Sequence, residues 1–185
     1  MYSRSSEPVR FERDCAAVLV PQGEAVTLPA GSVGYITQAL GGSFTVFVEG
    51  NLFRIAGRDA DAIGKEPPAP LELPADASDE AVEKLVWQQL RTCFDPEIPI
   101  NVVELGLVYS VVVQPKPEDA ARRVVYVEMT LTAPGCGMGD VLVADVRDKI
   151  ELIPTVAEAD VELVFDPPWN RTMMSEAARL ETGML

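Results

Sequence analysis

The stretch RVVYVEMTLTAPGCGMGDVLVADVRDKIELI, residues 123–153, decides how the second half of this chain folds. Residues 123–131 are predicted to form a strand, and Gly139-Asp140 is predicted to open a helix. A glycine-rich segment with one cysteine joins the two. The predicted helix has one apolar face, with residues spaced as a helix requires: Leu142, Val146, Ile150 and Ile153.

Elements on both sides of this stretch complete a helix–strand–strand–helix–strand order. Ser78 is predicted to cap the first helix. Its apolar face is expected at Val82, Val86, Leu90 and Cys93. Strands are predicted at 108–113 and 161–165, and a hairpin loop at 116–122. A last helix is predicted from Thr172, its cap, to Leu180. This order predicts a compact α/β (α+β) domain over 78–185, with a C-terminal extension.

The first part of the chain, 1–65, is predicted to be a small all-β unit, either a barrel or a sandwich. Turn signals rich in Pro and Gly separate its short β-prone runs, and a proline-rich linker follows at 66–77. The runs expected to be strands are 16–20, 25–28, 33–37, 43–48 and 52–55.

Charge and composition exclude several classes of function. The net charge of −14 at pH 7 disfavours binding to nucleic acid and to anionic membranes. No apolar run approaches the roughly 20 residues that span a bilayer. Residues 1–15 show no signal-peptide pattern, so we expect a cytoplasmic protein with no membrane association.

The chain has no histidine and three cysteines, Cys15, Cys93 and Cys136. The absence of imidazole excludes Ser–His and Cys–His nucleophilic pairs and imidazole metal ligands. The odd number of cysteines and a reducing compartment disfavour a disulfide framework. A soft metal would therefore need thiolate ligands, and one chain cannot supply four.

Cys136 is the strongest candidate for chemistry. Gly135 and Gly137 flank it, which favours an exposed sulfur, and it precedes a predicted helix N-terminus. The helix dipole and free N–H groups there stabilise a thiolate, which is both a nucleophile and a soft-metal ligand. The alternative is a tight strand-to-helix turn with an incidental cysteine.

A second candidate is the loop Asp95-Pro96-Glu97-Ile98-Pro99-Ile100-Asn101. Asp95, Glu97 and Asn101 could orient a partner or a metal, or could instead make the hydrogen bonds of a rigid turn. The two carboxylates, Asp95 and Glu97, are expected to be exposed. The pattern does not choose between these readings. We expect Cys93 to be a core residue. The pattern around Cys15 does not decide whether this residue is structural or functional.

Three segments resemble the MIP-eighteen/PaaD-type domain family of iron–sulfur protein maturation. They are Asp95–Pro99, Asn101–Tyr109 and Thr130–Cys136, which includes Thr132. Arg13-Asp14-Cys15, 38–42, 59–65 and the tail 168–171 resemble SufT proteins, so the resemblance covers nearly the whole chain. It implies a non-enzymatic factor for cluster assembly, with Cys136 as the functional cysteine and Cys15 as a second signature residue. Asp95, Glu97, Asn101 and Thr132 would form the supporting loops.

The resemblance also implies an iron–sulfur cluster as cofactor, and scaffold proteins and client apo-proteins as partners. Because one chain offers too few ligands, we expect the cluster to be labile. Because a cluster normally takes about four protein ligands, we expect it to be shared across a homodimer or with a partner. Two alternatives remain: a thiol enzyme with Cys136 as nucleophile, and a pure protein-interaction module.

Overall fold

The computed structural model describes residues 6–95, 98–135 and 137–184. The chain divides into two compact units, Met1–Ala69 and Pro70–Leu185, called the N-terminal unit and the C-terminal unit below. Each is described by itself. In the described part of the chain, no helix is both long and apolar enough to cross a membrane.

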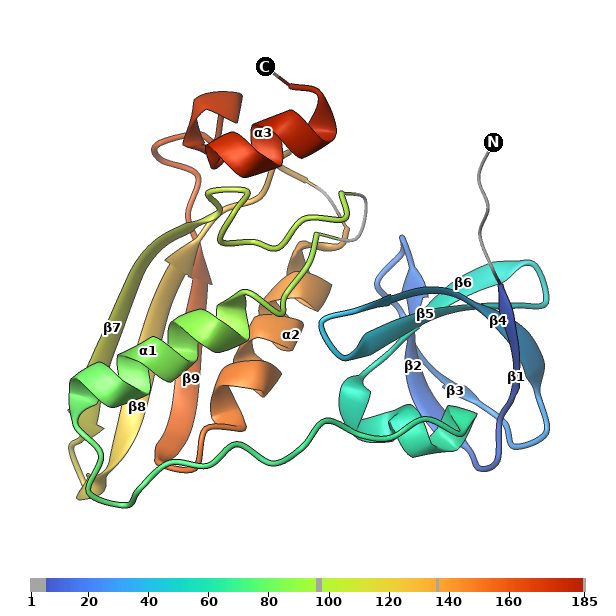
Figure 1. Cartoon of the computed structure of the whole chain (residues 1–185), viewed down its shortest axis with the longest axis horizontal. Helices are drawn as coiled ribbons and strands as arrows, with labels where there is room; N and C mark the ends of the chain where they lie inside the picture. Colours follow the sequence, from blue (N-terminus) through green and yellow to red (C-terminus); the bar gives the residue numbers. More distant parts are fainter. Residues whose placement is uncertain (1–5, 96–97, 136, 185) are drawn as a thin grey trace. The chain divides into compact units, whose positions relative to one another are not determined.

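One antiparallel sheet of six strands, curled upon itself, forms the N-terminal unit (Figure 1). The strands follow the spatial order β1-β4-β5-β6-β2-β3, and a 3-10 helix, η1, comes after the last of them. The bounds of these elements are β1 Glu7–Arg10, β2 Cys15–Val20, β3 Ala25–Leu28, β4 Val33–Leu40, β5 Ser43–Val48, β6 Asn51–Ile55 and η1 Gly57–Ile63.

The inner face of this sheet holds a small core. Phe11, Cys15, Val46 and Ile55 are at most 1% exposed. All five strands predicted from the sequence are present, and no predicted end differs from the observed one by more than three residues. Strand β1 and helix η1 were not predicted, because β1 is short and mixes charge with proline, and η1 carries an Asp-rich pattern without helical periodicity.

Two helices and a three-stranded sheet build the main body of the C-terminal unit, which confirms the predicted α+β class (Figure 1). Strands β7 and β8 pair antiparallel, and β8 and β9 pair parallel. Helix α1 contacts β7, and α2 contacts β9. The bounds are α1 Asp79–Leu90, β7 Val108–Lys116, β8 Asp119–Met129, α2 Gly139–Glu151, β9 Val156–Leu163, η2 Arg171–Met173 and α3 Glu176–Thr182.

The predicted helix faces are confirmed. The Ser78 hydroxyl accepts a hydrogen bond from the Ala81 N–H (3.2 Å), as expected for a cap. The two predicted faces contribute to one core, in which the following residues are at most 1% exposed: Val82, Val86, Leu90, Cys93, Leu142, Val146, Ile150 and Ile153. Cys93 is a core residue as predicted, although α1 ends three residues before it.

Several boundaries in the C-terminal unit differ from the prediction: β7 is longer at its end, and β8 starts and ends earlier. The third strand starts at Val156, not Val161, because Glu158 and Asp160 alternate with buried residues and hide the strand. The β7–β8 hairpin has a shorter loop than 116–122. Thr172 does not cap the last helix: it lies inside η2, and α3 is capped by Ser175, whose hydroxyl accepts from the Ala178 N–H (3.1 Å).

Candidate functional site

The glycine-rich segment after β8 follows the predicted strand–loop–helix order. The strand ends at Met129, and α2 starts at Gly139. Gly135 has φ +78°, in the left-handed region that favours glycine. Cys136 itself lies outside the described residues. The structure therefore confirms that the helix N-terminus comes shortly after the cysteine in sequence, and it leaves the role of the thiol a prediction.

Gly139, the first residue of α2, lies close to Leu131. A Cβ at this position would lie 2.9 Å from Leu131 Cδ1, the end of a flexible side chain that can shift to make room. Met138, the residue before α2, is 2% exposed. The start of α2 is thus packed close to the residues that follow β8.

The second predicted loop folds back on itself. Asp95 is 9% exposed, and its Oδ1 accepts a hydrogen bond from the Ile98 N–H (3.1 Å). The Asn101 Oδ1 accepts from the Val103 and Glu104 N–H groups, at 3.0 Å each. The expectation of an exposed Asp95 was wrong, because the loop uses this carboxylate internally. Glu97 lies outside the described residues.

Backbone hydrogen bonds join the two loops. The Val102 N–H donates to the Cys93 carbonyl (2.9 Å), and the Leu107 N–H donates to the Val102 carbonyl (3.0 Å). The Thr130 N–H then donates to the Leu107 carbonyl (2.8 Å). This series brings the loop that contains Asp95 and Asn101 next to the end of β8. Thr132, the remaining predicted supporting residue, follows two residues later and is half-buried.

Cys15 lies far from these loops in sequence, in β2 of the N-terminal unit, and it is fully buried. Burial, together with the Asp59 carboxylate, raises the pKa of its thiol to about 11. The thiol is therefore neutral near pH 7, and its contact with the Ala16 carbonyl is 3.4 Å. A neutral buried thiol is a poor metal ligand.

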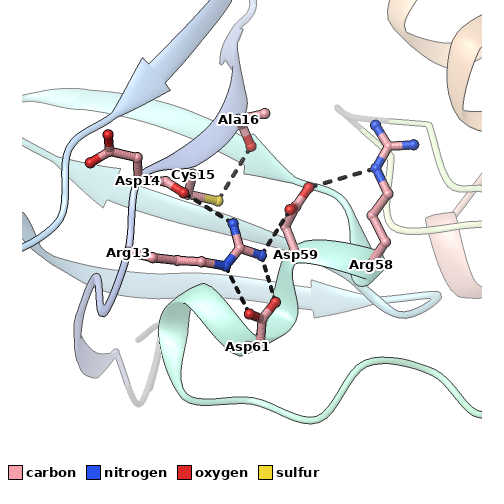
Figure 2. A network of polar contacts seen from close by, with 7 residues as sticks. All are labelled: Arg13, Asp14, Cys15, Ala16, Arg58, Asp59 and Asp61. Carbon is pink, nitrogen blue, oxygen red and sulfur yellow. Dashed lines mark hydrogen bonds and ion pairs between the residues drawn. The ribbon is translucent and has the colours of Figure 1, made fainter.

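The main polar feature around Cys15 is instead an ion-pair network, drawn in Figure 2, that the sequence did not predict. The Arg13 guanidinium donates to both oxygens of Asp61, at 2.6 and 2.8 Å, and to Asp59 at 3.0 Å. These bonds raise the pKa of Arg13, and the bond from Arg13 lowers the pKa of Asp61. The network ties η1 to the start of β2 and so has a structural role.

The C-terminal extension packs on the turn before β7. The Trp169 Nε1 donates to the Leu105 carbonyl (2.7 Å), and the Tyr109 hydroxyl donates to the Pro167 carbonyl (2.6 Å). An open hollow of about 630 Å³ lies beside this contact, and sequence patterns gave no sign of it. Its lining comprises Gly106, Val108, Tyr109, Glu128, Val164, Asp166, Pro167 and Met173.

In the described part of the chain, no three Cys, Asp or Glu side chains gather closely enough to hold a metal ion. The thiols of Cys15 and Cys93 are both fully buried, in two different cores. Cys15 and Cys136 were the two predicted ligands. The burial of Cys15 disfavours it as a ligand, and Cys136 stays a prediction.

The family described as iron–sulfur cluster assembly protein matches residues 83–162, the part of the chain that carries both loops. An Fe-S protein maturation auxiliary factor of Porphyromonas gingivalis is 47% identical over 103 residues, which cover 56% of this chain and 92% of that protein. The Fe-S protein maturation auxiliary factor SufT of Staphylococcus aureus is 39% identical over 90 residues, covering 49% of this chain and 96% of that protein.

A solved structure from Bacillus anthracis, described as a domain of unknown function, DUF59, has the same fold as the C-terminal part. It is 33% identical, with a TM-score of 0.50, over 58% of this chain and 96% of that structure. The chain therefore belongs to the iron–sulfur cluster assembly protein family, in its SufT-type branch. The matches span about half of the chain, so a large part of it lies outside what these relatives share.

Proposed function

We propose that this protein carries or delivers an iron–sulfur cluster as cargo in the cytoplasm, through the thiolate of Cys136, and that it does so without catalysing a reaction. Its family supports a role in cluster assembly. One observation supports the choice of residue. Two of the three thiols in the sequence, Cys15 and Cys93, are fully buried, and the sequence offers no histidine.

A single Cys136 cannot complete a cluster site, since a cluster takes about four protein ligands. Two chains, or one chain and a partner, would share the cluster, and small thiols would fill the remaining positions. Such a cluster is easily released, which suits transfer from a scaffold protein to a client apo-protein. The burial of Cys15 disfavours the four-cysteine dimer that the sequence allowed.

The thiol-enzyme alternative is weaker. Without histidine, the base would have to be a carboxylate or an external group. Asp95, the described carboxylate of the neighbouring loop, is 9% exposed and accepts a hydrogen bond from the Ile98 N–H. Asp95 therefore stabilises its loop, which is a structural role.

Anaerobic reconstitution with iron and sulfide tests the proposal. The wild type should bind both, with absorbance that bleaches in air, and Cys136→Ser should bind neither. Cys93→Ala is the matched control, since it removes a thiol from the core of the same unit. A cluster of full occupancy on Cys136→Ser would refute the proposal.

A further inference from the structure

The sheet of the C-terminal unit has one face that does not take part in the core. On the other face, residues of β8 such as Val125 and Val127 pack with the buried residues of α1 and α2. Successive side chains of a strand point to opposite faces, so the alternate residues face away from this core. We call them the open face, which comprises three cross-strand rows: Ser110–Glu128–Glu162, Val112–Tyr126–Asp160 and Gln114–Val124–Glu158.

The open face combines an apolar centre with acidic surroundings. Val112 is 43% exposed and its partner Tyr126 is 40% exposed. The described residues of the open face include four carboxylates and no basic side chain. Glu128 and Glu162 are direct partners across β8 and β9, and like charges placed opposite each other destabilise a sheet. A contribution to stability therefore does not explain this pair.

A hollow of about 630 Å³ adjoins the open face, because Glu128 belongs to both. Asp166 gives the hollow a second carboxylate, and most of its remaining lining is apolar or aromatic: Val108, Tyr109, Val164, Pro167 and Met173. The volume lies within the range of about 300–1,000 Å³ that is usual for ligand sites. Apolar walls together with carboxylates suit a side chain with an apolar stem and a cationic head, which means arginine or lysine.

The carboxylates of this surface have no cationic partner in the parts of the chain that the structure describes. The Ser110 hydroxyl donates to Glu128 Oε2 (2.9 Å), which is a contact with a neutral group. Within 6–95, 98–135 and 137–184, no Lys or Arg forms an ion pair with a carboxylate of the open face or the hollow. A cation that neutralises them would therefore come from another molecule.

Charge discriminates between the possible occupants. A second copy would bring the same carboxylates, and nucleic acid and anionic membranes would also be repelled. Described Cys, Asp and Glu side chains do not gather in threes closely enough to hold a metal ion. A basic protein segment complements the carboxylates, and its cationic side chains also interact favourably with an exposed aromatic ring such as that of Tyr126.

The hollow lies at the end of the sheet where the glycine-rich segment begins. Val164, which lines the hollow, donates its N–H to the carbonyl of Met129, the last residue of β8 (2.8 Å). The N–H of the next residue, Thr130, donates to the carbonyl of Leu107, the neighbour of Val108 in the lining (2.8 Å). A partner bound in the hollow would thus lie beside the start of the segment that contains Cys136 in sequence.

We propose that the open face and the hollow bind a basic segment of a partner protein, with an arginine or lysine side chain of that segment in the hollow lined by Glu128 and Asp166. The segment covers Tyr126 and Val112, and its cations neutralise the carboxylates around them. The inference deepens the proposed function, on which it rests for the reason why a partner docks close to the glycine-rich segment.

Nuclear magnetic resonance on metal-free, ¹⁵N-labelled protein tests the surface separately from the cluster. The probe is the synthetic peptide acetyl-Arg-Leu-Trp-Arg-Leu-Arg-amide. It should shift the amide signals of the open face and the hollow, and added salt should weaken its binding. The same peptide with Gln in place of each Arg should not bind there. Shifts centred elsewhere on the protein, or equal binding of the neutral peptide, would overturn the proposal.

A double variant tests the hollow. Glu128→Gln with Asp166→Asn should weaken peptide binding about fivefold, because two ion pairs are lost. Glu80→Gln with Glu118→Gln is the matched control, since it removes two exposed carboxylates of the same unit that lie outside this surface. An equal loss in both double variants would mean that only the overall charge attracts the peptide, and would overturn the site.

Glu162→Gln separates binding from folding. It removes the like-charge pair with Glu128, so urea unfolding should show a variant at least as stable as the wild type, while the peptide should bind more weakly. Unchanged peptide binding in this variant would contradict a role for the open face. Sedimentation velocity and a titration with calcium chloride examine the other occupants. Self-association that the double variant abolishes, or the same signal shifts with calcium alone, would overturn the proposal.

The proposed function can fail or stand independently of this surface. Anaerobic reconstitution of the Glu128→Gln, Asp166→Asn variant should give the iron and sulfide content of the wild type. If the peptide does not bind the open face and Cys136→Ser still abolishes cluster binding, the surface is wrong and the proposed function stands. If the peptide binds there and Cys136→Ser retains a full cluster, the role of Cys136 is wrong and the surface stands.

Discussion

The Trp169 Nε1 donates a hydrogen bond of 2.7 Å to the carbonyl oxygen of Leu105. A second bond runs from the Ser175 N–H to the Glu104 carbonyl at 2.8 Å. A hydrogen bond with the Ser175 side chain, with help from Arg91, lowers the pKa of Glu104. The C-terminal extension is thereby fixed to the turn that leads from the Asp95 loop into β7.

We predict that Trp169→Phe lowers the free energy of unfolding by about 1 kcal/mol, since it removes one hydrogen bond and little volume. Gly106→Ala should cost more, because Gly106 has φ +72° and its Cβ would lie against the Met173 carbonyl. Urea unfolding measures both. Gly183→Ala is the control: Gly183 also has a positive φ, at 68°, but no atom lies within 4 Å of its Cβ position. Equal losses for the two glycine variants would contradict a role for this contact.

Asp95→Ala should lower stability by roughly 1–2 kcal/mol, because it leaves the Ile98 N–H without its acceptor in a buried loop. Asp95→Asn keeps an acceptor oxygen and should recover most of the loss. Asp119→Ala is a matched control, since the Asp119 Oδ1 also accepts a backbone N–H, from Ala121, but in an exposed hairpin. Cluster transfer lost in a stable Asp95→Asn would show that the charge itself has a function.

The sequence predicted the fold well where a pattern is local. Turn residues marked the strands of the N-terminal unit, and the spacing of Val82, Val86 and Leu90 marked a helix face that the structure buries. Strand β9 was placed too late, because Glu158 and Asp160 occupy its exposed positions. Helix η1 was missed because its Asp-rich sequence has no helical periodicity, and its ion pair between Asp61 and Arg13 joins residues 48 positions apart.

The candidate site was less predictable for the same reason. The burial of Asp95 follows from hydrogen bonds within its loop and from the bridge between Phe94 and Asn101, which residue types alone do not reveal. The state of Cys15 depends on long-range packing, because the residues that bury it come from other strands and from η1. Motifs identified the family, whereas three-dimensional contacts decide which motif residues are structural.

Stability should fall as pH rises from about 9 to 11, in part because of Cys15. Burial raises the pKa of its thiol to about 11, so the unfolded chain loses this proton at lower pH than the folded chain does. The thiol then favours the unfolded state progressively across that range. Urea unfolding at pH 8 and pH 10.5 should show a smaller loss for Cys15→Ala than for the wild type. An identical loss in both would mean that Cys15 does not contribute.

We predict that the proline-rich linker separates two folding units, and that its first half is the part open to protease. Leu71 and Leu73 pack against the core of the C-terminal unit, so residues after Pro70 should be protected. Brief digestion with proteinase K, followed by mass spectrometry, should show a first cut between Gly64 and Ala69. A first cut elsewhere, or resistance throughout the linker, would contradict this division.

Cys136 should be the fastest thiol to react in the native protein. Cys15 and Cys93 are each fully buried, and burial raises the pKa of the Cys15 thiol, so alkylation of either requires the surrounding core to open. Limiting iodoacetamide at pH 7.5, followed by peptide mapping, should label Cys136 first and leave the other two unmodified until urea is added. Cys136→Ser should then show no native labelling.

The pH dependence of the alkylation rate adds a sharper test, because a thiolate stabilised at the start of α2 reacts with an apparent pKa below that of a free cysteine. Labelling of Cys93 before Cys136 would show that the reactive thiol has been assigned to the wrong residue.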